Sequence, residues 1–332
     1  MHPLEKTVLG SSGLGVTRLG LGCAAIGGLY GDIPDDQATQ VVHKALDLGL
    51  NLFDTAPLYG SGKSEERLGR ALRDVPRDTY VLASKVGRLL VASDDEQRDR
   101  SIFDNPPPFK PVFDFSYDGV MRSLEESLKR LGVDRIDILH IHDPDAHWRE
   151  AIEGTYPALE RLRSEGVIRA VSAGMNQWEM LARFAREGDF DCFLLAGRYS
   201  LLDQSALDEL LPLCVEKNIG IMAGGTYNSG ILAKGAKPGA TYNYGEAPID
   251  IKQKAQAIET VAERHGVDVK AAASQFVFAH PAITCIIPGT RQPARVEENF
   301  NLLTDQITSA FWDELRAKNL VHENAPLPET RH

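Results

Sequence analysis

The chain has 332 residues, of which 43% are hydrophobic and 25% charged, and its formal net charge is -11. This composition is typical of a globular protein with enough apolar material for a core. The acidic balance argues against nucleic acid as a partner, because phosphate binding requires clustered Lys and Arg side chains. No stretch approaches the uninterrupted apolar length that a membrane span needs, so we expect no membrane association.

The four cysteines, Cys23, Cys192, Cys214 and Cys285, are too far apart for a CxxC redox pair or a zinc cluster. Three of them stand in apolar, strand-like runs, a usage that suits a reducing compartment. The N-terminal stretch MHPLEKTVLGSSG lacks the apolar run of a signal peptide. We therefore expect a cytoplasmic protein, and the sequence leaves open whether it is a monomer or a homo-oligomer.

Short apolar runs alternate with amphipathic stretches along the chain. The opening VLGSSGLGVTRLGLG predicts a β-hairpin, because Ser-Ser-Gly is turn chemistry between two short β runs. Strands are then predicted over 19–23, 50–54, 79–85, 136–142, 167–173, 191–197, 219–224 and 283–288. Helices are predicted over 35–48, 63–73, 117–131, 177–186 and 204–217, with Asp35 and Ser64 at N-cap positions.

Eight strands separated by helices predict a parallel sheet, since parallel neighbours need crossover connections. Eight is also the number that closes a barrel, so the predicted fold is α/β: a single (β/α)8 TIM barrel domain over residues 1–332. A doubly wound open sheet is the alternative. The segments 88–116 and 233–249 follow the third and seventh strands, so we expect long loops at the C-terminal mouth. A disordered insertion over the acidic stretch 91–106 is the other interpretation.

Four polar residues fall at or just after the C-terminal ends of predicted strands, where barrel enzymes assemble their sites. Asp54, Lys85 and His142 end the second, third and fourth strands, and Tyr59 follows Asp54 in the loop DTAPLYG. Pairing Lys85 with Asp54 would remove the cost of burying either charge alone. We expect the ammonium to lower the pKa of Tyr59 and make it a proton donor or acceptor near neutral pH. Taken singly, each of the four could instead have only a structural role.

Six stretches are distinctive in their order and spacing: DTAPLYGSGKSEERLGRAL, ASKVGR, SLEESLKRLGVDRIDILHIHDPD, EGVIRAVSAGMNQWE, YNSGIL and IIPGTRQPARVEENF. With them, the sequence resembles the aldo-keto reductase superfamily over about residues 9–303. Within the family, FDFSYDGV, IHDPD, FLLAGRYSLLDQ and YNSGILAKG are most similar to bacterial aldose dehydrogenases and to the related L-galactose and pyridoxal dehydrogenases.

The resemblance implies a catalytic tetrad of Asp54, Tyr59, Lys85 and His142, with an extended NAD or NADP molecule across the barrel mouth. Tyr59 would exchange the proton, His142 would orient the substrate oxygen, and the cofactor would exchange the hydride. The implied cofactor contacts are Gly22, Cys23, Asn176, Asn228, Ser229, Gly230, Leu232, Gly289, Arg291, Arg295 and Asn299.

Five positions depart from the family pattern: Gly174-Met175 replaces a Ser-Asn pair, Ala196 a Gln, Gly224 a stacking Tyr, and Gly289 a Lys that meets the 2'-phosphate of NADP. These departures favour NAD slightly, although Arg291 and Arg295 could still accept NADP.

The predicted function is oxidation of an aldose, or a similar hydroxy-aldehyde, to its lactone with NAD(P). The partner is then a small-molecule sugar or aldehyde. A broad NADPH-dependent aldehyde or ketone reductase is the alternative. Substrate contacts are predicted for Tyr30, Leu58, Trp148, Phe109, Phe113 and Tyr242, for each of which ordinary packing is equally open.

Two different classes of function compete with this interpretation. His140, His142, Asp143, Asp145 and His147 are dense enough to suggest a metal-dependent barrel hydrolase, because HxH on a barrel strand can bind a metal ion. However, none of the remaining histidines falls at a predicted strand end, so no metal site is predicted. A channel-partner role, known in some family members, is disfavoured by the complete tetrad and by the absence of an extended tail.

Overall fold

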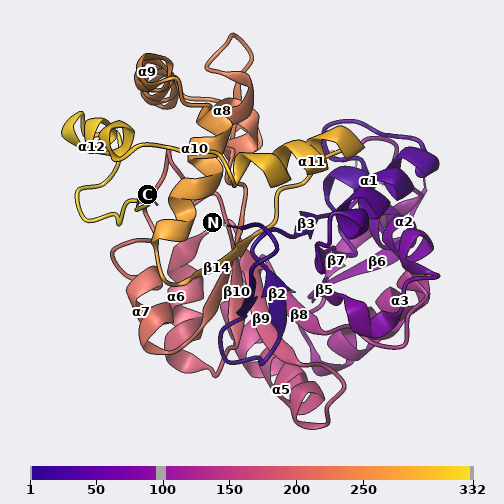
Figure 1. The fold of residues 1–332 in the computed structure, drawn as a ribbon. Helices are drawn as coiled ribbons and strands as arrows, with labels where there is room; N and C mark the ends of the chain where they lie inside the picture. Colours follow the sequence, from indigo (N-terminus) through magenta and orange to yellow (C-terminus); the bar gives the residue numbers. More distant parts are fainter. Residues whose placement is uncertain (1, 95–101, 330–332) are drawn as a thin grey trace.

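The eight-stranded barrel expected from the sequence is present in the computed structural model, which describes residues 2–94 and 102–329 (Figure 1). The sheet order is β14-β11-β10-β9-β8-β5-β4-β3, and every neighbouring pair is parallel. Parallel bridges from Leu19 to Ile286 and from Gly22 to Gly289 join the two outer strands and close the barrel. The strands are β3 Leu21–Gly22, β4 Leu52–Asp54, β5 Val81–Val86, β8 Ile138–His142, β9 Ala170–Met175, β10 Cys192–Ala196, β11 Gly220–Gly224 and β14 Ile283–Ile286.

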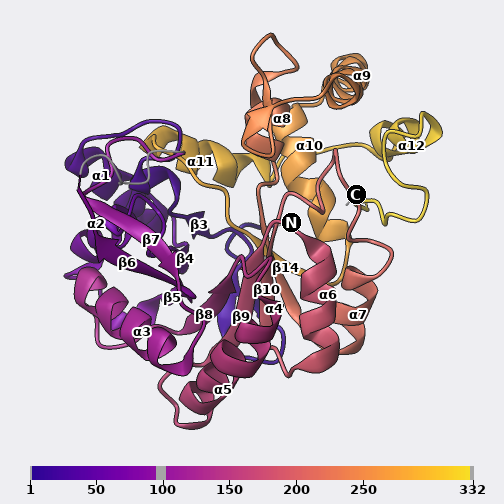
Figure 2. The ribbon, with the colours of Figure 1, turned by 180° about the vertical axis from the view of Figure 1, so that it is seen from behind.

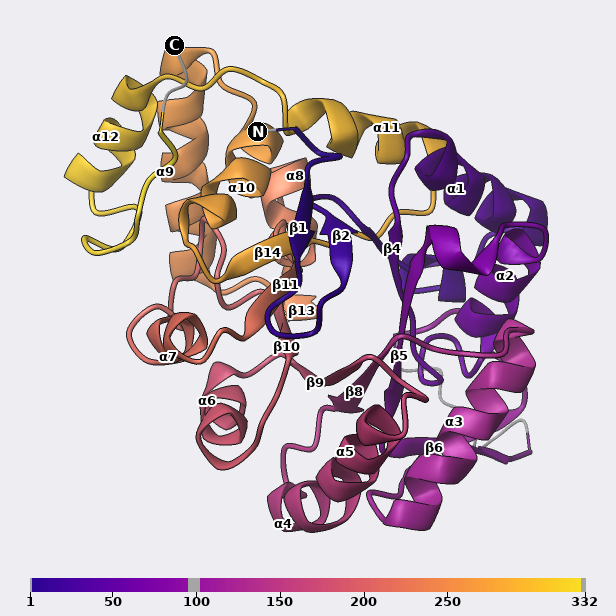
Figure 3. The same ribbon diagram turned by 60° about the horizontal axis from the view of Figure 1, so that its bottom comes forward.

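The predicted N-terminal hairpin is also confirmed, as β1 Lys6–Val8 paired antiparallel with β2 Gly15–Thr17. Figure 3 shows it lying across the end of the barrel opposite the mouth. Leu9 and Leu14 in its turn are buried and pack in one apolar cluster with barrel residues that include Leu52. The hairpin therefore closes the bottom of the barrel and leaves the C-terminal ends of the strands for the site.

Helices surround the barrel because their apolar residues recur at helical spacing and face the strands (Figures 1 and 2). In α1, for example, the buried residues Ala38, Val41, Val42 and Ala45 form one such face. The main helices are α1 Asp35–Asp47, α2 Lys63–Leu72, α3 Tyr117–Leu131, α5 Tyr156–Ser164, α6 Trp178–Glu187, α7 Leu210–Glu216, α9 Ile249–His265, α10 Val269–Phe276, α11 Pro293–Leu302 and α12 Ser309–Ala317. Within the described part of the chain, no helix is long and apolar enough to cross a membrane.

Two predicted N-caps are wrong. The helices α1 and α2 are preceded by Pro34 and Gly62, so Asp35 and Ser64 lie inside the first turn. Asp35 instead forms an ion pair with Arg67, with Nε and Oδ1 2.8 Å apart. The Ser64 hydroxyl donates to the carbonyl of Cys23 at 2.8 Å and thereby ties α2 to the chain segment after β3.

The described parts of the segment after β5 have more regular structure than the loop that the sequence predicted. Its two ends form an antiparallel hairpin, β6 Arg88–Ala92 with β7 Phe109–Phe113, beside α2 and α3 in Figure 2. Its apolar residues explain the pairing, since β-branched and aromatic side chains favour strands. Phe103 also forms an antiparallel bridge with Leu29. Of the stretch for which disorder was the alternative, residues 95–101 lie outside the described residues.

The second long segment contains the short helix α8 Ile231–Lys234 and a small hairpin, β12 Thr241–Tyr242 with β13 Gly245–Glu246. Like β6 and β7, it follows a barrel strand and so lies at the mouth. The predicted helix over 204–217 is shorter than expected, because helical structure begins only at Leu210.

Candidate functional site

A buried ion pair occupies the C-terminal ends of β4 and β5. Lys85 Nζ donates to Asp54 Oδ1 at 2.7 Å, to Oδ2 at 2.8 Å and to the carbonyl of Thr55 at 2.9 Å. Both side chains are only 2% exposed. Burial alone would raise the pKa of Asp54, but the Lys85 ammonium and His140 together outweigh burial and lower it. Each charge therefore neutralises the other inside the barrel.

Tyr59 lies directly over this pair, in the loop between β4 and α2. The Lys85 ammonium is 5.0 Å from the centroid of the Tyr59 ring, which is a cation–π distance. The imidazole of His142 stands edge-on to the same ring at 5.9 Å between centroids. Phe103 covers another side of the ring at 6.0 Å. The structure thus brings together all four residues of the predicted tetrad.

The expected lowering of the Tyr59 pKa is wrong for this structure. Burial raises the pKa of the phenol well above its usual value, and the Asp54 carboxylate adds to the shift. The Lys85 ammonium does not reverse this shift, because it already bonds three oxygens and lies over the face of the Tyr59 ring. Tyr59 is therefore a neutral phenol at pH 7, a state suited to giving a proton.

His142 is held neutral. Burial lowers its pKa well below the usual value, and the cations of Arg88 and Lys85 lower it further. Its Nδ1 atom is buried and has no hydrogen-bond partner among the described residues. His140 stands two residues before His142 on β8. Its Nδ1 atom forms a hydrogen bond with the hydroxyl of Ser172 at 2.7 Å, and its Nε2 lies 3.2 Å from Asp54 Oδ1. His140 therefore belongs to the buried network beneath the tetrad.

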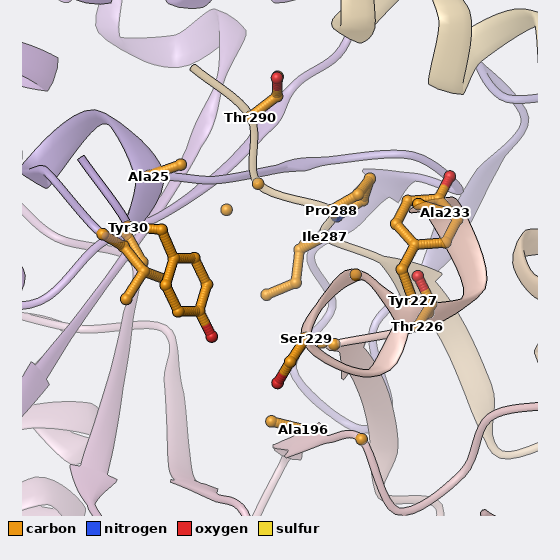
Figure 4. A pocket seen from close by; sticks show the side chains of 18 of the residues that line it. Ala25, Tyr30, Ala196, Thr226, Tyr227, Ser229, Ala233, Ile287, Pro288 and Thr290 are labelled. Atoms are coloured by element: carbon orange, nitrogen blue, oxygen red, sulfur yellow. The ribbon is translucent and has the colours of Figure 1, made fainter. Parts of the chain in front are cut away.

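A cavity of about 480 Å³ extends from Tyr59 and Asp54 across the barrel mouth. Figure 4 shows Tyr30 on one side of it, Tyr227 on the other, and Ile287 and Ser229 between them. It takes in ten predicted cofactor contacts, Gly22, Cys23, Asn176, Asn228, Ser229, Gly230, Gly289, Arg291, Arg295 and Asn299. Leu232 does not line it, because this side chain is buried in the hydrophobic core.

Three observations indicate that the cavity fits a dinucleotide. Its lining extends from Asp54 and Tyr59 of the tetrad to a cationic end with Arg291 and Arg295, where phosphate or adenosine groups could bind. The hydroxyl of Thr226, on the cavity wall, is buried without a hydrogen-bond partner in the described part of the chain. Small residues, among them Gly224, leave space in the cavity wall: a Cβ atom added at Gly224 would meet its nearest neighbours only at 3.5 Å or more.

Gly22 and Gly289, predicted only as cofactor contacts, are also needed for close packing of the backbone. A Cβ on Gly22 would lie 2.6 Å from the carbonyl oxygen of Ile287, and one on Gly289 would lie 3.0 Å from the carbonyl oxygen of Gly22. Glycine at these positions lets β3 approach the chain after β14 and close the barrel. A lysine at 289 would therefore strain this contact.

The predicted substrate contacts do not all reach the cavity. Tyr30 lines it and stacks on Tyr244, with ring centroids 6.5 Å apart. Leu58 is partly exposed beside Tyr59. Trp148 faces away from the cavity, since its ring packs 4.6 Å from that of Phe184 on α6.

The other three candidates lie on the two mouth hairpins. Phe109 and Phe113 are exposed on β7, and Phe113 stacks on Phe115 at 5.8 Å. Tyr242 donates its hydroxyl hydrogen to Asp203 Oδ2 at 2.9 Å, so it supports the β12–β13 hairpin. Asn243 and Tyr244, in the turn of that hairpin, line the cavity instead.

Several residues near the site were not predicted to act there. Tyr244 and Thr226 line the cavity, and Phe103 covers Tyr59. Arg88 and Asp143 form an ion pair next to His142. Arg88 stands in the ASKVGR motif and Asp143 in HIHDPD, so the motifs contained both residues without indicating that they pair.

Comparison with known proteins identifies the family. The aldo/keto reductase family model matches residues 18–320. The chain belongs to the aldo/keto reductase family. Pyridoxal 4-dehydrogenase of Microbacterium luteolum is 37% identical, over 96% of this chain and 98% of that protein. D-threo-aldose 1-dehydrogenase of a Pseudomonas species is also 37% identical, over 94% and 96%. L-galactose dehydrogenase of Arabidopsis thaliana is 30% identical, over 92% and 90%.

Solved structures agree on the fold of this aldo/keto reductase. One from Bacillus halodurans, at 23% identity, has a TM-score of 0.77 and covers 98% of each chain. A glycerol dehydrogenase from Gluconobacter oxydans, at 25% identity, has a TM-score of 0.73 with the same coverage. The protein is accordingly an NAD(P)-dependent oxidoreductase with a small-molecule substrate. Membership of this family replaces the barrel-hydrolase alternative.

Proposed function

We propose that this aldo/keto reductase oxidises an aldose, or a similar hydroxy-aldehyde, at C1 to give the lactone, with NAD used in preference to NADP. The observation that carries the proposal is the position of Tyr59, between the Lys85–Asp54 pair and His142, at one end of an elongated cavity. The two relatives at 37% identity, a pyridoxal and an aldose dehydrogenase, both support oxidation of a hydroxylated substrate.

In the proposed reaction the chain's own residues handle the proton and orient the substrate. His142 is neutral, so its Nε2–H can donate to the oxygen on C1 and hold it beside the phenol. Tyr59, as phenolate, takes the proton from that hydroxyl. A bound NAD would supply the hydride acceptor for C1, and its oxidised nicotinamide would bring a positive charge into the cavity. Such a charge favours the phenolate and opposes the effect of burial on Tyr59.

The Lys85–Asp54 pair supports this chemistry without exchanging a proton itself. Its hydrogen bonds fix the ammonium against the Tyr59 ring, and the Asp54 carboxylate offsets the cost of burying that ammonium. In the cavity, residues 226–230 would wrap the pyrophosphate, and Arg291 and Arg295 would hold the adenosine end.

Reduction of an aldehyde or ketone is the second candidate, and one observation favours it. The raised pKa of Tyr59 keeps the phenol protonated at neutral pH, as a proton donor in reduction must be. An NADH-specific methylglyoxal reductase from Escherichia coli, 27% identical, is among the relatives.

One absorbance screen at the reduced-nicotinamide band separates the two candidates. Purified protein is assayed with NAD or NADP against L-fucose, other aldoses and pyridoxal, and with the reduced cofactors against simple aldehydes. The proposal predicts growth of the band with at least one aldose, and a higher kcat/KM for NAD than for NADP. Turnover of simple aldehydes without oxidation of any aldose would instead establish the reductase.

A further inference from the structure

A second ion pair stands at the mouth, directly beside the tetrad. Arg88 Nη2 lies 3.0 Å from Asp143 Oδ2, and the same carboxylate oxygen is 3.5 Å from His142 Nε2. The barrel register explains the pairing. Lys85 is opposite His140 and Val86 is opposite Ile141 in the β5–β8 pair, so two further residues along each chain bring Arg88 to Asp143. None of the tetrad roles described above uses this pair.

The guanidinium of Arg88 is held in place on two sides. Besides Asp143, it lies 4.9 Å over the ring of Phe113. That ring stacks on Phe115, which in turn covers Gly87, where a Cβ atom would come within 2.2 Å of the Phe115 ring. Arg88 Nε is buried and has no hydrogen-bond partner in the described part of the chain, so the side chain keeps unused donor capacity.

Asp143 is held in an unfavourable backbone conformation. Its φ is +40°, in the left-handed region, although it carries a side chain and precedes Pro144. Such strain persists at sites where the surrounding structure requires a particular side-chain direction. Its side chain remains 18% exposed, so part of it is accessible from solvent.

Asp143 is not among the residues that line the cavity, but its charge reaches two phenols that are. Its charge acts on the phenols of Tyr59 and Tyr244, both of which line the cavity. Burial raises the pKa of Asp143 itself to about 6 in spite of Arg88 and a hydrogen bond from the backbone of Asn176, so the carboxylate is mostly ionised at neutral pH. It retains lone pairs that can accept further hydrogen bonds.

We infer that Arg88 and Asp143 form a subsite for a substrate hydroxyl on the carbon next to the reacting one. The substrate oxygen bound by His142 Nε2 lies next to Asp143, because the two groups are already in near contact. A hydroxyl on the neighbouring carbon can donate to the Asp143 carboxylate and accept from the Arg88 guanidinium. A simple aldehyde offers no such group. The pair would therefore select α-hydroxy carbonyl compounds over plain ones, which deepens the proposed function and rests on it.

The test compares substrates that differ in this hydroxyl. We choose reduction of glycolaldehyde and of propionaldehyde, because that pair does not require the protein to be an aldose dehydrogenase. Asp143→Asn removes the charge, and asparagine tolerates a positive φ. We expect its kcat/KM for glycolaldehyde to fall about 10- to 100-fold, the range for hydrogen bonds to charged groups, and that for propionaldehyde to change less than about threefold.

Two further variants make the test decisive. Arg88→Met should produce the same selective loss for glycolaldehyde. Asp189→Asn serves as the matched control, because Asp189 pairs with Arg163 at 2.9 Å, is 81% exposed, and precedes β10 at the end of the barrel away from the mouth. It should leave both substrates unchanged. Equal losses for the two aldehydes in Asp143→Asn, or no loss for either, would overturn the hydroxyl subsite.

L-fucose and its 2-deoxy analogue separate this inference from the proposed function. If aldose oxidation occurs, Asp143→Asn should affect L-fucose more than the 2-deoxy sugar, by the same factor as for the aldehydes. If the wild type oxidises no aldose but shows the glycolaldehyde selectivity, the subsite stands and the aldose dehydrogenase proposal fails. Selectivity for L-fucose that survives in Asp143→Asn would contradict the subsite alone.

Discussion

Replacing Lys85 with methionine should destabilise the protein strongly, because it leaves Asp54 buried without its partner. The two side chains are 2% exposed and 2.7 Å apart at their closest atoms. At an effective dielectric constant of about 20, this separation corresponds to roughly 6 kcal/mol of attraction, part of which offsets the cost of burying the charges. We expect Lys85→Met to lower the free energy of unfolding by about 3–5 kcal/mol, as measured by urea denaturation.

The double variant Asp54→Asn/Lys85→Met distinguishes a lost ion pair from a packing defect. It removes the isolated charge, so it should recover part of the stability while activity stays absent. The pH dependence should also change sign. In the wild type the lowered pKa of Asp54 contributes stability above its unfolded pKa, and this is lost as pH falls through the folded pKa.

In Lys85→Met, burial without the ammonium raises the pKa of Asp54, so the folded state takes up a proton more readily than the unfolded state. The stability deficit of that variant should therefore shrink between about pH 7 and pH 5. A Lys85→Met protein as stable as the wild type, or a double variant no more stable than the single one, would refute the reasoning about the pair.

Three further predictions concern the proton, the cofactor and the mouth. Because the pKa of Tyr59 is raised, the rate of aldose oxidation should increase about tenfold per pH unit up to that pKa. The rate of aldehyde reduction should stay level across neutral pH. Steady-state pH profiles that show the reverse would contradict this prediction. Thr226→Val should weaken NAD binding about 3- to 10-fold, as measured by titration calorimetry. The free protein should be at least as stable as the wild type, since the Thr226 hydroxyl has no partner among the described residues. Unchanged affinity for NAD would count against a cofactor contact at this residue. Arg67→Ala should lower the free energy of unfolding by about 2–4 kcal/mol, because the Arg67 guanidinium, 5% exposed, donates to the carbonyls of Ile26 and Ile33. A loss under about 1 kcal/mol in urea denaturation would show that the loop after β3 does not depend on these hydrogen bonds.

The barrel could be predicted from the sequence because its signal is repeated. Eight apolar runs separated by helical stretches leave few architectures, and the turn chemistry of residues 10–13 specifies the opening hairpin. The β6–β7 hairpin was missed because its strands are separated by a long polar segment, so no short turn signals their pairing. The N-caps were misplaced because Pro34 and Gly62, not the polar residues after them, precede the helices.

The tetrad could be placed from strand ends and the family resemblance, but its electrostatics could not. Sequence identifies Lys85 as a neighbour of Tyr59 without telling that the ammonium lies over the ring and is already bonded to three oxygens. Burial then dominates the pKa of the phenol. Trp148 shows a similar limit, since six residues after His142 the chain has turned toward α6. The Arg88–Asp143 pair needed the β5–β8 register, which no local pattern supplies.

The most direct test of the central claim is a comparison of Tyr59→Phe with the wild type in NAD-dependent oxidation of L-fucose, together with NAD affinity. The phenylalanine ring keeps the contacts with Lys85 and His142 but cannot exchange a proton. The account predicts that kcat falls about 10²- to 10⁴-fold while the Kd for NAD changes less than about threefold. Turnover close to that of the wild type would contradict the proton-transfer role of Tyr59.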